Sequence, residues 1–418
     1  MDNYRLLIIS HNCLSRHNSN GRTLLNLLNG FQKENLIQIY TSGEFPNEDL
    51  VAEFLRVSNK DVVSSYLKLK GCYSTPQPVQ TEQKGSQQTG GKKTAVTMLL
   101  RDLVWDNAWI QHKSIYAWAQ SKQPNAILLQ LSDSTLLITL ALRLAKKLGI
   151  PLITYNTEDY YFKNYDYMKK TDRMGLFYRL FHLRFQKSFK KLMAYANQNV
   201  YNCYGLKRLY DEHFGCSSQV ILPASDFKIT EMANRENTLI SYAGNLGVGR
   251  HVSLIKIANA LQGIDSSLFV DVYGTADEQI QNDFAKCKGI RYHGFVSYEK
   301  VCDVIQNSRL LLHIESFDSY YKVDTRYAFS TKIVDYCASG RPIFLFAPCD
   351  CEAAEYLSNK EAAFVCSNET CLKSSLEQAL NNEELREAKS KNALSLSQCM
   401  HQIDKNSQLF LKILEDLN

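Results

Sequence analysis

A glycine-rich turn in the second half of the chain has the composition of a phosphate-binding loop. Residues 244–250 read GNLGVGR and stand between a short apolar run and a helical pattern. Glycines such as Gly247 and Gly249 let the backbone approach a phosphate, and a helix N-terminus offers free N–H groups. Arg250 adds a planar guanidinium suited to phosphate oxygens. The spacing is not GxGxxG, which excludes the dinucleotide fingerprint, and a turn that only tightens a strand–helix corner is the alternative.

The segment 329–342 predicts a short helix whose N-terminus can meet an anion. Ser330 or Thr331 suits the N-cap, and a Gly-Arg-Pro sequence ends the helical pattern. Side chains lean toward the N-terminus of a helix, so Asp335 is expected to point back to that end. There its carboxylate could accept hydrogen bonds from two vicinal hydroxyls, as on a ribose, while Lys332 offsets negative charge. A capped helix with a purely structural aspartate is the alternative.

Two further strand ends in this half carry polar or aromatic side chains. His313 and Glu315 end one apolar run, and His293 ends another, followed by Gly294 and Phe295. Ligands of open parallel sheets bind outside the carboxyl ends of the strands. We therefore expect His293 to frame a flat base, and His313 and Glu315 to lie at the same edge of the sheet. A histidine that only makes a structural hydrogen bond is the alternative at both positions.

Carboxylates also follow buried strands in the first half of the chain. Glu158 and Asp159 come after one apolar run, and Asp133 comes after another. Such carboxylates are candidates for general-base work, and we assign Glu158 or Asp159 to the reacting centre. The run Asn20-Gly21-Arg22 opens the first helical pattern and is predicted to receive a phosphate or a hydroxyl-rich acceptor.

Positioning these side chains requires a particular order of elements. Apolar runs of strand length alternate with helical patterns in both halves, at 5–10, 35–41, 126–131, 151–156, 199–203 and 219–222, and then at 239–243, 268–273, 290–293, 310–315 and 343–346. Strands that alternate with helices form parallel sheets with right-handed crossovers. The fold class is therefore α/β, with two Rossmann-like doubly wound domains facing each other across a cleft.

The pattern is interrupted at one point, which gives the domain boundaries. Residues 223–238 are polar and aperiodic, so we expect a hinge there. We assign 1–224 to a first domain and 225–400 to a second domain. The last helical stretch, 401–418, could cross back onto the first domain.

Residues 74–94 differ in composition from their surroundings. They are rich in Gln, with two prolines, three glycines and one valine as the sole aliphatic residue. Such a stretch buries too little apolar area to offset its ordering entropy, so we expect a mobile loop. A binding loop that orders on substrate is the alternative.

Composition limits the classes of partner and compartment. The 418 residues are 45% hydrophobic and 22% charged, with a net charge of +5, which gives no reason to expect a nucleic-acid partner. The twelve cysteines form no paired CxxC motif, and the sequence shows neither a secretion signal nor an apolar stretch of transmembrane length. We therefore expect reduced thiols and a cytoplasmic location.

One helical pattern is basic and amphipathic. Residues 162–193 hold nine Lys or Arg against two Asp, and an apolar face repeats at helical spacing from Met174 to Leu192. Such a helix can lie peripherally on the anionic inner face of a cell membrane. A helix packed on its own domain with a solvated basic face is the alternative.

The order of these motifs resembles a known family. YAGNLGVGR, VYG, YHGFV, HIE and FSTKIVDYCASGRPI resemble the C-terminal half of GT-B glycosyltransferases of the family 4-like group. LSDSTLLITLALRLAKKLGIPLITYNTEDYYFK resembles the N-terminal half of members from bacterial polysaccharide biosynthesis. The resemblance implies a nucleotide-sugar donor in the second domain and the acceptor in the first. It implies that Arg250 and the turn 330–332 contact the diphosphate and that Asp335 contacts the ribose.

The sequence departs from this family at two positions. The first of the family's two glutamates, eight residues apart, would fall on Tyr327, so its sugar contact is missing or is taken by Glu315. The lysine usually found shortly after the arginine is absent, and Lys332 could replace it. No Asp-x-Asp triplet of the metal-binding kind is present. We therefore expect no cofactor and no metal, with charge on the leaving diphosphate offset by Arg250, Lys332 and helix ends.

The resemblance predicts an enzyme of the hexosyltransferase type. It would transfer a sugar from a nucleotide sugar to a glycan or lipid-linked glycan in surface polysaccharide biosynthesis. A sugar-nucleotide epimerase on the same scaffold is one alternative. A catalytically inactive nucleotide-sugar-binding subunit is the other, for which Tyr327 is the main argument.

Overall fold

The computed structural model describes residues 4–15, 19–46, 49–74, 94–163, 165–166, 168, 174–228 and 239–417. The chain divides into two compact units. Unit 1 comprises Met1–Leu222 with Asn406–Asn418, and unit 2 comprises Pro223–Lys405. The chain therefore passes from one unit to the other twice, and its last helix belongs to unit 1. The loop predicted at 74–94 lies almost entirely outside the described residues.

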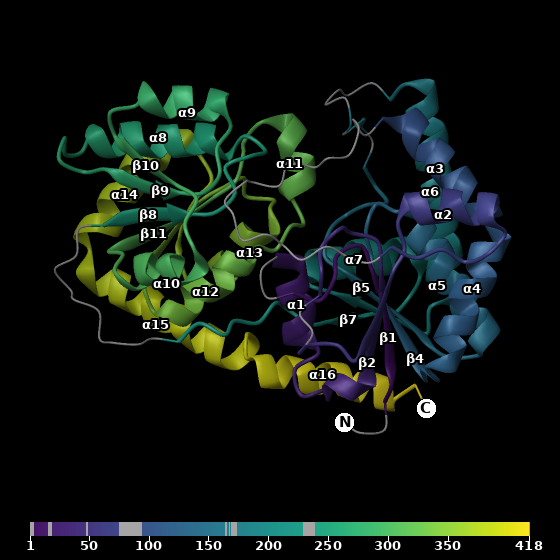
Figure 1. Ribbon diagram of the computed structural model, residues 1–418. Helices are drawn as coiled ribbons and strands as arrows, with labels where there is room; N and C mark the ends of the chain where they lie inside the picture. The colour runs from purple at the N-terminus through teal and green to yellow at the C-terminus, as the bar shows by residue number, and fades with distance from the viewer. Residues whose placement is uncertain are drawn as a thin grey trace. The chain divides into compact units, whose positions relative to one another are not determined.

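Unit 1 is built on a parallel sheet of seven strands with the order β3-β2-β1-β4-β5-β6-β7. The strands are β1 (Leu6–Ser10), β2 (Leu36–Tyr40), β3 (Glu53–Arg56), β4 (Ala126–Gln130), β5 (Leu152–Asn156), β6 (Gln198–Tyr201) and β7 (Gln219–Val220). The helices are α1 (Ser19–Leu27), η1 (Lys33–Asn35), α2 (Asn59–Lys68), α3 (Ala95–Asn107), α4 (Trp109–Ser121), α5 (Thr135–Leu148), α6 (Leu176–Tyr195), α7 (Tyr204–Phe214) and α16 (Ile403–Glu415). Strands β1, β2, β4 and β5 are buried along their whole length, which explains their continuous apolar runs (Figure 1).

Unit 2 repeats this plan with six parallel strands in the order β10-β9-β8-β11-β12-β13. The strands are β8 (Ile240–Ala243), β9 (Val270–Tyr273), β10 (Ile290–Gly294), β11 (Leu310–Ile314), β12 (Ile343–Phe346) and β13 (Phe364–Cys366). The helices are α8 (Arg250–Gln262), α9 (Glu278–Ala285), α10 (Tyr298–Gln306), α11 (Ser319–Thr325), α12 (Thr331–Ser339), α13 (Glu352–Asn359), η2 (Glu369–Cys371), α14 (Leu372–Asn381) and α15 (Glu383–Met400).

Both sheets reverse their strand order once, and that reversal locates the sites. In unit 1 the order changes direction between β1 and β4, and in unit 2 it changes between β8 and β11. At such a switch point the chain leaves two neighbouring strands toward opposite faces of the sheet. A crevice therefore opens at the carboxyl ends of the strands, and ligands of doubly wound folds bind there.

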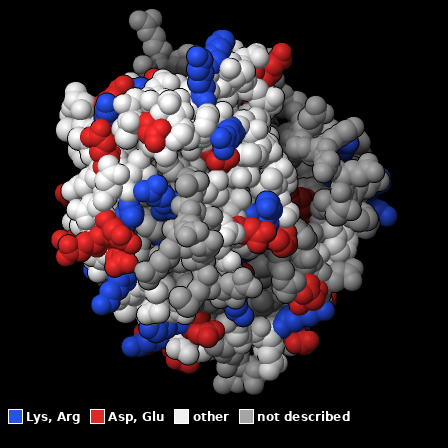
Figure 2. Space-filling model, turned by 90° about the vertical axis from the view of Figure 1, so that its left-hand side faces the viewer, with Lys and Arg blue, Asp and Glu red and all other residues white. Residues whose placement is uncertain are grey.

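Helix α16 completes the core of unit 1. Phe410 and Leu414 are buried with residues of β1, β4 and β5 in one apolar cluster, and the Tyr4 hydroxyl donates to the Leu414 carbonyl. Among the described residues, no helix has the length and hydropathy needed to cross a bilayer. On the face shown in Figure 2, basic and acidic side chains are interspersed, in keeping with the small net charge.

Candidate active site

The switch point of unit 2 brings together an arginine and a glutamate that are far apart in sequence. Arg250 begins α8 just after β8, and Glu315 follows β11. The Arg250 guanidinium donates from Nε to Glu315 Oε2 at 2.9 Å and from an Nη to Oε1 at 3.0 Å. This two-point pair fixes the orientation of the guanidinium at the place where ligands of this fold bind.

Glu315 is a buried carboxylate within a cluster of charges. Its side chain is 2% exposed, and His313 Nε2 lies 3.5 Å from its Oε1. Burial alone would raise the pKa of the Glu315 carboxyl, but His313 and Arg250 outweigh it and hold that pKa below its usual value. Burial lowers the pKa of the His313 imidazole. Glu315, predicted to lie near the reacting sugar, thus has its carboxylate directed at Arg250.

Lys332 joins Arg250 from the start of α12. Its ammonium donates to the Tyr242 hydroxyl at 3.1 Å and lies over the Tyr242 ring at 4.4 Å from the centroid. The same ammonium lies against the backbone of Gly244, where a Cβ would come within 2.3 Å of Nζ. Burial, and after it Arg250, lowers the pKa of Lys332 to about 7. Two cations from separate segments therefore lie in one cluster around Tyr242.

The glycine-rich turn 244–250 has backbone angles that favour glycine. Gly249 is in the left-handed region at φ 74°, where it caps α8, and a Cβ there would come within 2.5 Å of Ser316 Oγ. The Gly247 N–H donates to Asn245 Oδ1 at 2.8 Å. The Arg250 N–H donates to the Gly247 carbonyl at 3.2 Å and is engaged within the turn as well, so the Arg250 side chain is the main group here for an anion.

Helix α12 begins and ends where the sequence predicts. Ser330 is the N-cap and accepts from the Lys332 N–H at 3.3 Å, while Thr331 is the first helical residue. Asp335 is 5% exposed and accepts a hydrogen bond from Ser225 Oγ at 2.5 Å. Its carboxylate is thus in contact with the segment that enters unit 2 after Leu222.

A cavity of about 330 Å³ lies beside this cluster at the ends of β8 and β9. It is lined by Gly244, Asn245, Tyr273, Gly274, Thr275, Phe295, Val296 and Val301. Phe295 is 79% exposed, so it offers a free aromatic surface at the cavity. His293, expected to frame a flat base, is bound to Asp271 at 2.6 Å and stacked on Tyr273 at 4.6 Å between centroids. Because Tyr273 lines the cavity, His293 affects this space by supporting the Tyr273 ring on which it stacks.

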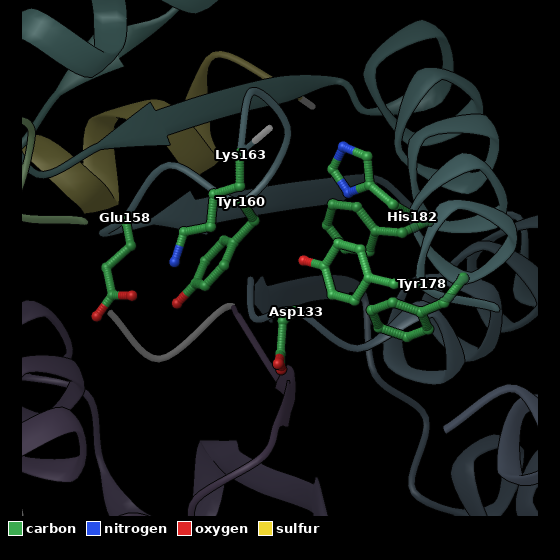
Figure 3. A pocket seen from close by; sticks show the side chains of 8 residues that line it. Asp133, Glu158, Tyr160, Lys163, Tyr178 and His182 are labelled. Carbon is green, nitrogen blue, oxygen red and sulfur yellow. The ribbon is translucent and has the colours of Figure 1, made fainter. Parts of the chain in front are cut away.

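Unit 1 holds a second cavity, of about 230 Å³, beyond the ends of β4 and β5. It is lined by Asp133, Glu158, Tyr160, Lys163, Tyr178, Phe181, His182 and Phe185. In Figure 3, Glu158, Tyr160 and Lys163 come from the segment after β5, while Tyr178 and His182 come from α6 on the other side. Carboxylates and aromatic rings around a space of this size can hold a hydroxylated ring.

Two groups of this cavity have shifted pKa values. Burial, and after it the charges of Glu158 and Asp133, raises the pKa of the Tyr160 hydroxyl well above its usual value, so this group stays a hydrogen-bond donor. Burial lowers the pKa of His182, which favours the neutral imidazole. The charged groups lining the cavity are therefore Asp133, Glu158 and Lys163.

The other residues predicted in unit 1 have different surroundings. Asp159 accepts through Oδ1 from the N–H groups of Tyr161 and Phe162 and from the Tyr210 hydroxyl at 2.7 Å. Its carboxylate thus holds the turn after β5, which favours Glu158 as the group facing a ligand. Asn20, Gly21 and Arg22 lie in the first turn of α1, and neither Gly21 nor Arg22 lines the unit 1 cavity.

Most of the predicted apolar face of residues 162–193 packs inside unit 1, but Phe177, which belongs to it, is 54% exposed. Phe181, Phe185, Phe189 and Leu192 are all buried. The alternative of a helix packed on its own domain is therefore correct for these residues. The first turns of α6 have a second apolar stripe that the sequence pattern did not separate from the first: Leu176, Leu180 and Leu183 are 70%, 48% and 61% exposed.

Comparison with known proteins agrees with this architecture. Residues 252–412 match a glycosyl transferase-like family. HepE from Anabaena, solved in complex with UDP, has a TM-score of 0.65 at 10% identity, over 99% of this chain and 100% of that one. Sucrose-phosphate synthase from Thermosynechococcus elongatus has a TM-score of 0.64 at 9% identity, over 99% of both chains. WaaG, a glycosyltransferase involved in lipopolysaccharide biosynthesis, has 0.56 at 12%, over 97% of this chain and 99% of that one.

Likeness at this level of identity defines the fold, which is the GT-B fold of glycosyltransferases. No curated protein matches the sequence. The family match lies mainly in unit 2, which is part of this same fold.

Proposed function

We propose that this protein transfers a sugar from a nucleotide sugar, with unit 2 holding the donor, to a glycan or lipid-linked glycan in surface polysaccharide biosynthesis. The observation that carries the proposal is the cluster of Arg250 and Lys332 at the switch point of unit 2, beside a partly aromatic cavity. Two cations suit a diphosphate, and the adjoining cavity suits the base attached to it.

The geometry suggests how the donor would lie. The nucleobase would occupy the cavity against Tyr273 and Phe295, and the diphosphate would lie between Lys332 and Arg250. Asp335 would accept from the ribose hydroxyls once Ser225 gives way. HepE has been solved with UDP and with UDP-glucose, which supports a uridine nucleotide as the first donor to test.

The reaction forms one bond and breaks one. An acceptor hydroxyl oxygen bonds to the anomeric carbon of the donor sugar, and the bond from that carbon to the diphosphate oxygen breaks. The electron pair stays on the diphosphate, whose added charge Arg250 and Lys332 would stabilise. The hydroxyl proton passes to a base, for which Glu158 is the candidate because it lines the unit 1 cavity while Asp159 is engaged in a turn.

Transfer is proposed to proceed without a divalent metal ion, because the two cations supply the charge that a metal would otherwise provide. We expect EDTA to leave the initial rate within about twofold of the untreated enzyme. A loss of turnover in EDTA that added Mg²⁺ or Mn²⁺ restores would contradict this part of the proposal.

We also propose that transfer takes place at the cytoplasmic face of a membrane, with residues 162–193 in peripheral contact. Within this range, α6 carries Arg179, Arg184 and three lysines and no acidic residue. The surface that makes the contact is argued below.

Donor binding is the most direct test. A thermal shift with UDP should raise the melting temperature of the protein, because a ligand that binds only the folded state stabilises it. Arg250→Ala should weaken UDP binding by about 100-fold, as expected when a charge-assisted contact is lost. The matched control is Lys256→Ala, which removes an exposed cation from the same helix and should leave the shift unchanged.

Arg250→Ala leaves Glu315 without its arginine partner, which can destabilise unit 2. The double variant Arg250→Ala with Glu315→Gln removes that unpaired charge and should still fail to bind UDP. Undiminished UDP binding in this folded double variant would refute the donor site. A transferase releases UDP from UDP-glucose only when an acceptor receives the sugar, whereas an epimerase needs no acceptor, so assays with and without acceptor separate the two.

A further inference from the structure

Two cavities of unit 1 meet at α6. The first is the cavity with Asp133 and Glu158 described above. The second, of about 410 Å³, is lined by Phe162, Lys163, Met174, Arg179, His182, Leu183 and Gln186. Lys163 and His182 line both cavities, so the two spaces adjoin along these side chains.

The two cavities differ in the charge that they present. The first has two carboxylates, which suit the hydroxyls of a sugar. The second has Lys163 and Arg179 and no carboxylate among the described residues that line it, and its walls are apolar at Met174 and Leu183. A ligand that occupies both cavities would place hydroxyl groups in the first cavity and a negatively charged group in the second.

The second cavity opens onto an apolar surface. Leu183 lines this cavity and is also part of the exposed stripe Leu176, Leu180 and Leu183 on α6. We name this stripe, together with the exposed apolar residues of α2 and α3, the apolar face of unit 1. Those of α3 are Val96, Leu100 and Leu103, and those of α2 are Val63 and Leu67.

Of the three helices of the apolar face, α3 packs against both α2 and α6. Ala95 and Met98 of α3 are buried with Tyr178 and Phe181 of α6. On its other side, Val104 of α3 accepts from the Tyr66 hydroxyl of α2 at 2.6 Å. The exposed positions of each helix lie outside these contacts, and we infer that the three stripes face the same side of unit 1.

Basic side chains accompany the apolar face. In α6, Lys187, Lys190 and Lys191 are exposed and continue the side of the helix that the leucines begin. The acidic residues of α2 and α3 are buried or paired: Asp61 and Asp102 are buried, and Asp106 pairs with Arg184. Apolar residues next to unopposed lysines fit the surface of an anionic bilayer, where leucines enter the leaflet and lysines meet headgroups.

We propose that unit 1 binds an acceptor whose sugar is joined through a phosphate or diphosphate to a lipid, presented by an anionic bilayer on the apolar face. The sugar would occupy the cavity with Asp133 and Glu158, and the phosphate would bind Lys163 and Arg179. The lipid would follow Leu183 into the leaflet. This inference rests on the proposed transferase function. It selects the lipid-linked acceptor over a free glycan, because a free glycan has no lipid part that would bring the apolar face to a bilayer.

Binding of a soluble probe tests the phosphate position. Farnesyl phosphate, below its micelle concentration, should bind the full-length protein at least about tenfold more tightly than farnesol. The double variant Lys163→Gln with Arg179→Gln should lose that preference, and Lys113→Gln, at an exposed lysine on α4, should keep it. Equal binding of the two probes, or a preference that survives in the double variant, overturns the inference. Arg179→Gln alone, at an exposed position, serves if the double variant does not fold.

Vesicle flotation tests the apolar face. The protein should float with vesicles of phosphatidylcholine and phosphatidylglycerol, and Leu180→Asp with Leu183→Asp should abolish this. Leu409→Asp is the matched control, because Leu409 is an exposed leucine of unit 1 on α16. No flotation of the wild type, or equal flotation of the leucine variant, overturns the inference. The UDP thermal shift is measured on the same samples, and if it persists, the inference has failed while the donor site stands.

Discussion

Lys332 is held in surroundings that disfavour its own charge. Burial and the neighbouring Arg250 lower the pKa of its ammonium to about 7, despite the opposing effect of Glu315. A bound diphosphate would place negative charge beside it and raise that pKa. Binding of a diphosphate and protonation of Lys332 are therefore linked, and the linkage falls in the physiological pH range.

We predict that donor affinity falls as the pH rises above about 7. Below this value Lys332 is charged in both the free and the bound protein, so affinity is constant. Above it the free protein has lost a proton that binding must restore, at a cost of up to about tenfold in affinity per pH unit. UDP-glucose is the ligand to use, because its diphosphate does not titrate in this range.

Calorimetry at about pH 6 and about pH 8, in buffers of different ionisation enthalpy, measures the affinity and the proton uptake. Lys332→Gln provides the control, since it removes the titrating group and should flatten the pH profile. A wild-type affinity that is the same at both pH values would count against the placement of the diphosphate at Lys332.

At the scale of single residues, the sequence predicts which residues belong to the site better than it predicts which of them contact one another. Arg250 stands after β8 and Lys332 at the predicted N-terminus of α12, and the structure brings both to Tyr242. Glu315 was recognisable as a strand-end carboxylate, but its pairing with Arg250 joins residues 65 positions apart. Neither that pairing nor the stacking of His293 on Tyr273 leaves a local signal in the sequence.

At the scale of elements, the backbone of the turn between β8 and α8 determines how much space the Lys332 ammonium has. Gly244 is at φ 152°, and a Cβ at this residue would overlap the Lys332 ammonium. Lysine side chains are flexible, so the overlap would be relieved by displacing Nζ. A methyl group here should therefore affect the ligand site more than the fold.

We predict that Gly244→Ala weakens UDP binding by about tenfold while lowering stability by about 1 kcal/mol. Gly263→Ala is the comparison, because a Cβ at Gly263 meets only backbone oxygens at 3.4 Å and beyond, and φ is negative. Thermal melts with and without UDP separate the two effects. Tight UDP binding in Gly244→Ala would show that Lys332 does not need its observed position.

Most elements follow from the sequence because the central strands are buried on both faces and therefore read as apolar runs. The strands that the pattern does not predict are β3 and β13. Both lie at sheet edges and are only four and three residues long, too short for a clear period. The exposed stripe of α6 was hidden for another reason: the helix is apolar on two sides, and only tertiary packing decides which side is covered.

For the whole molecule, unit 1 depends on a helix that the chain reaches only after unit 2. We predict that Phe410→Ala, which empties a fully buried site, destabilises unit 1 by about 3–5 kcal/mol. Leu409→Ala on the same helix is half exposed and should have little effect. All three tryptophans, at 105, 109 and 118, are in unit 1, so their fluorescence follows its unfolding. A Phe410→Ala variant as stable as Leu409→Ala would refute the dependence on α16.

The return of the chain to unit 1 also sets an order of events during translation. Everything that unit 2 comprises, Pro223–Lys405, is synthesised before Asn406–Asn418, the last segment of unit 1. While unit 2 is being synthesised, the apolar site that Phe410 and Leu414 later fill in unit 1 is therefore exposed to water. Chaperones that recognise exposed apolar surface would meet this protein mainly in that interval, and a premature stop codon shortly before residue 406 would leave unit 2 nearly whole but unit 1 permanently unfinished.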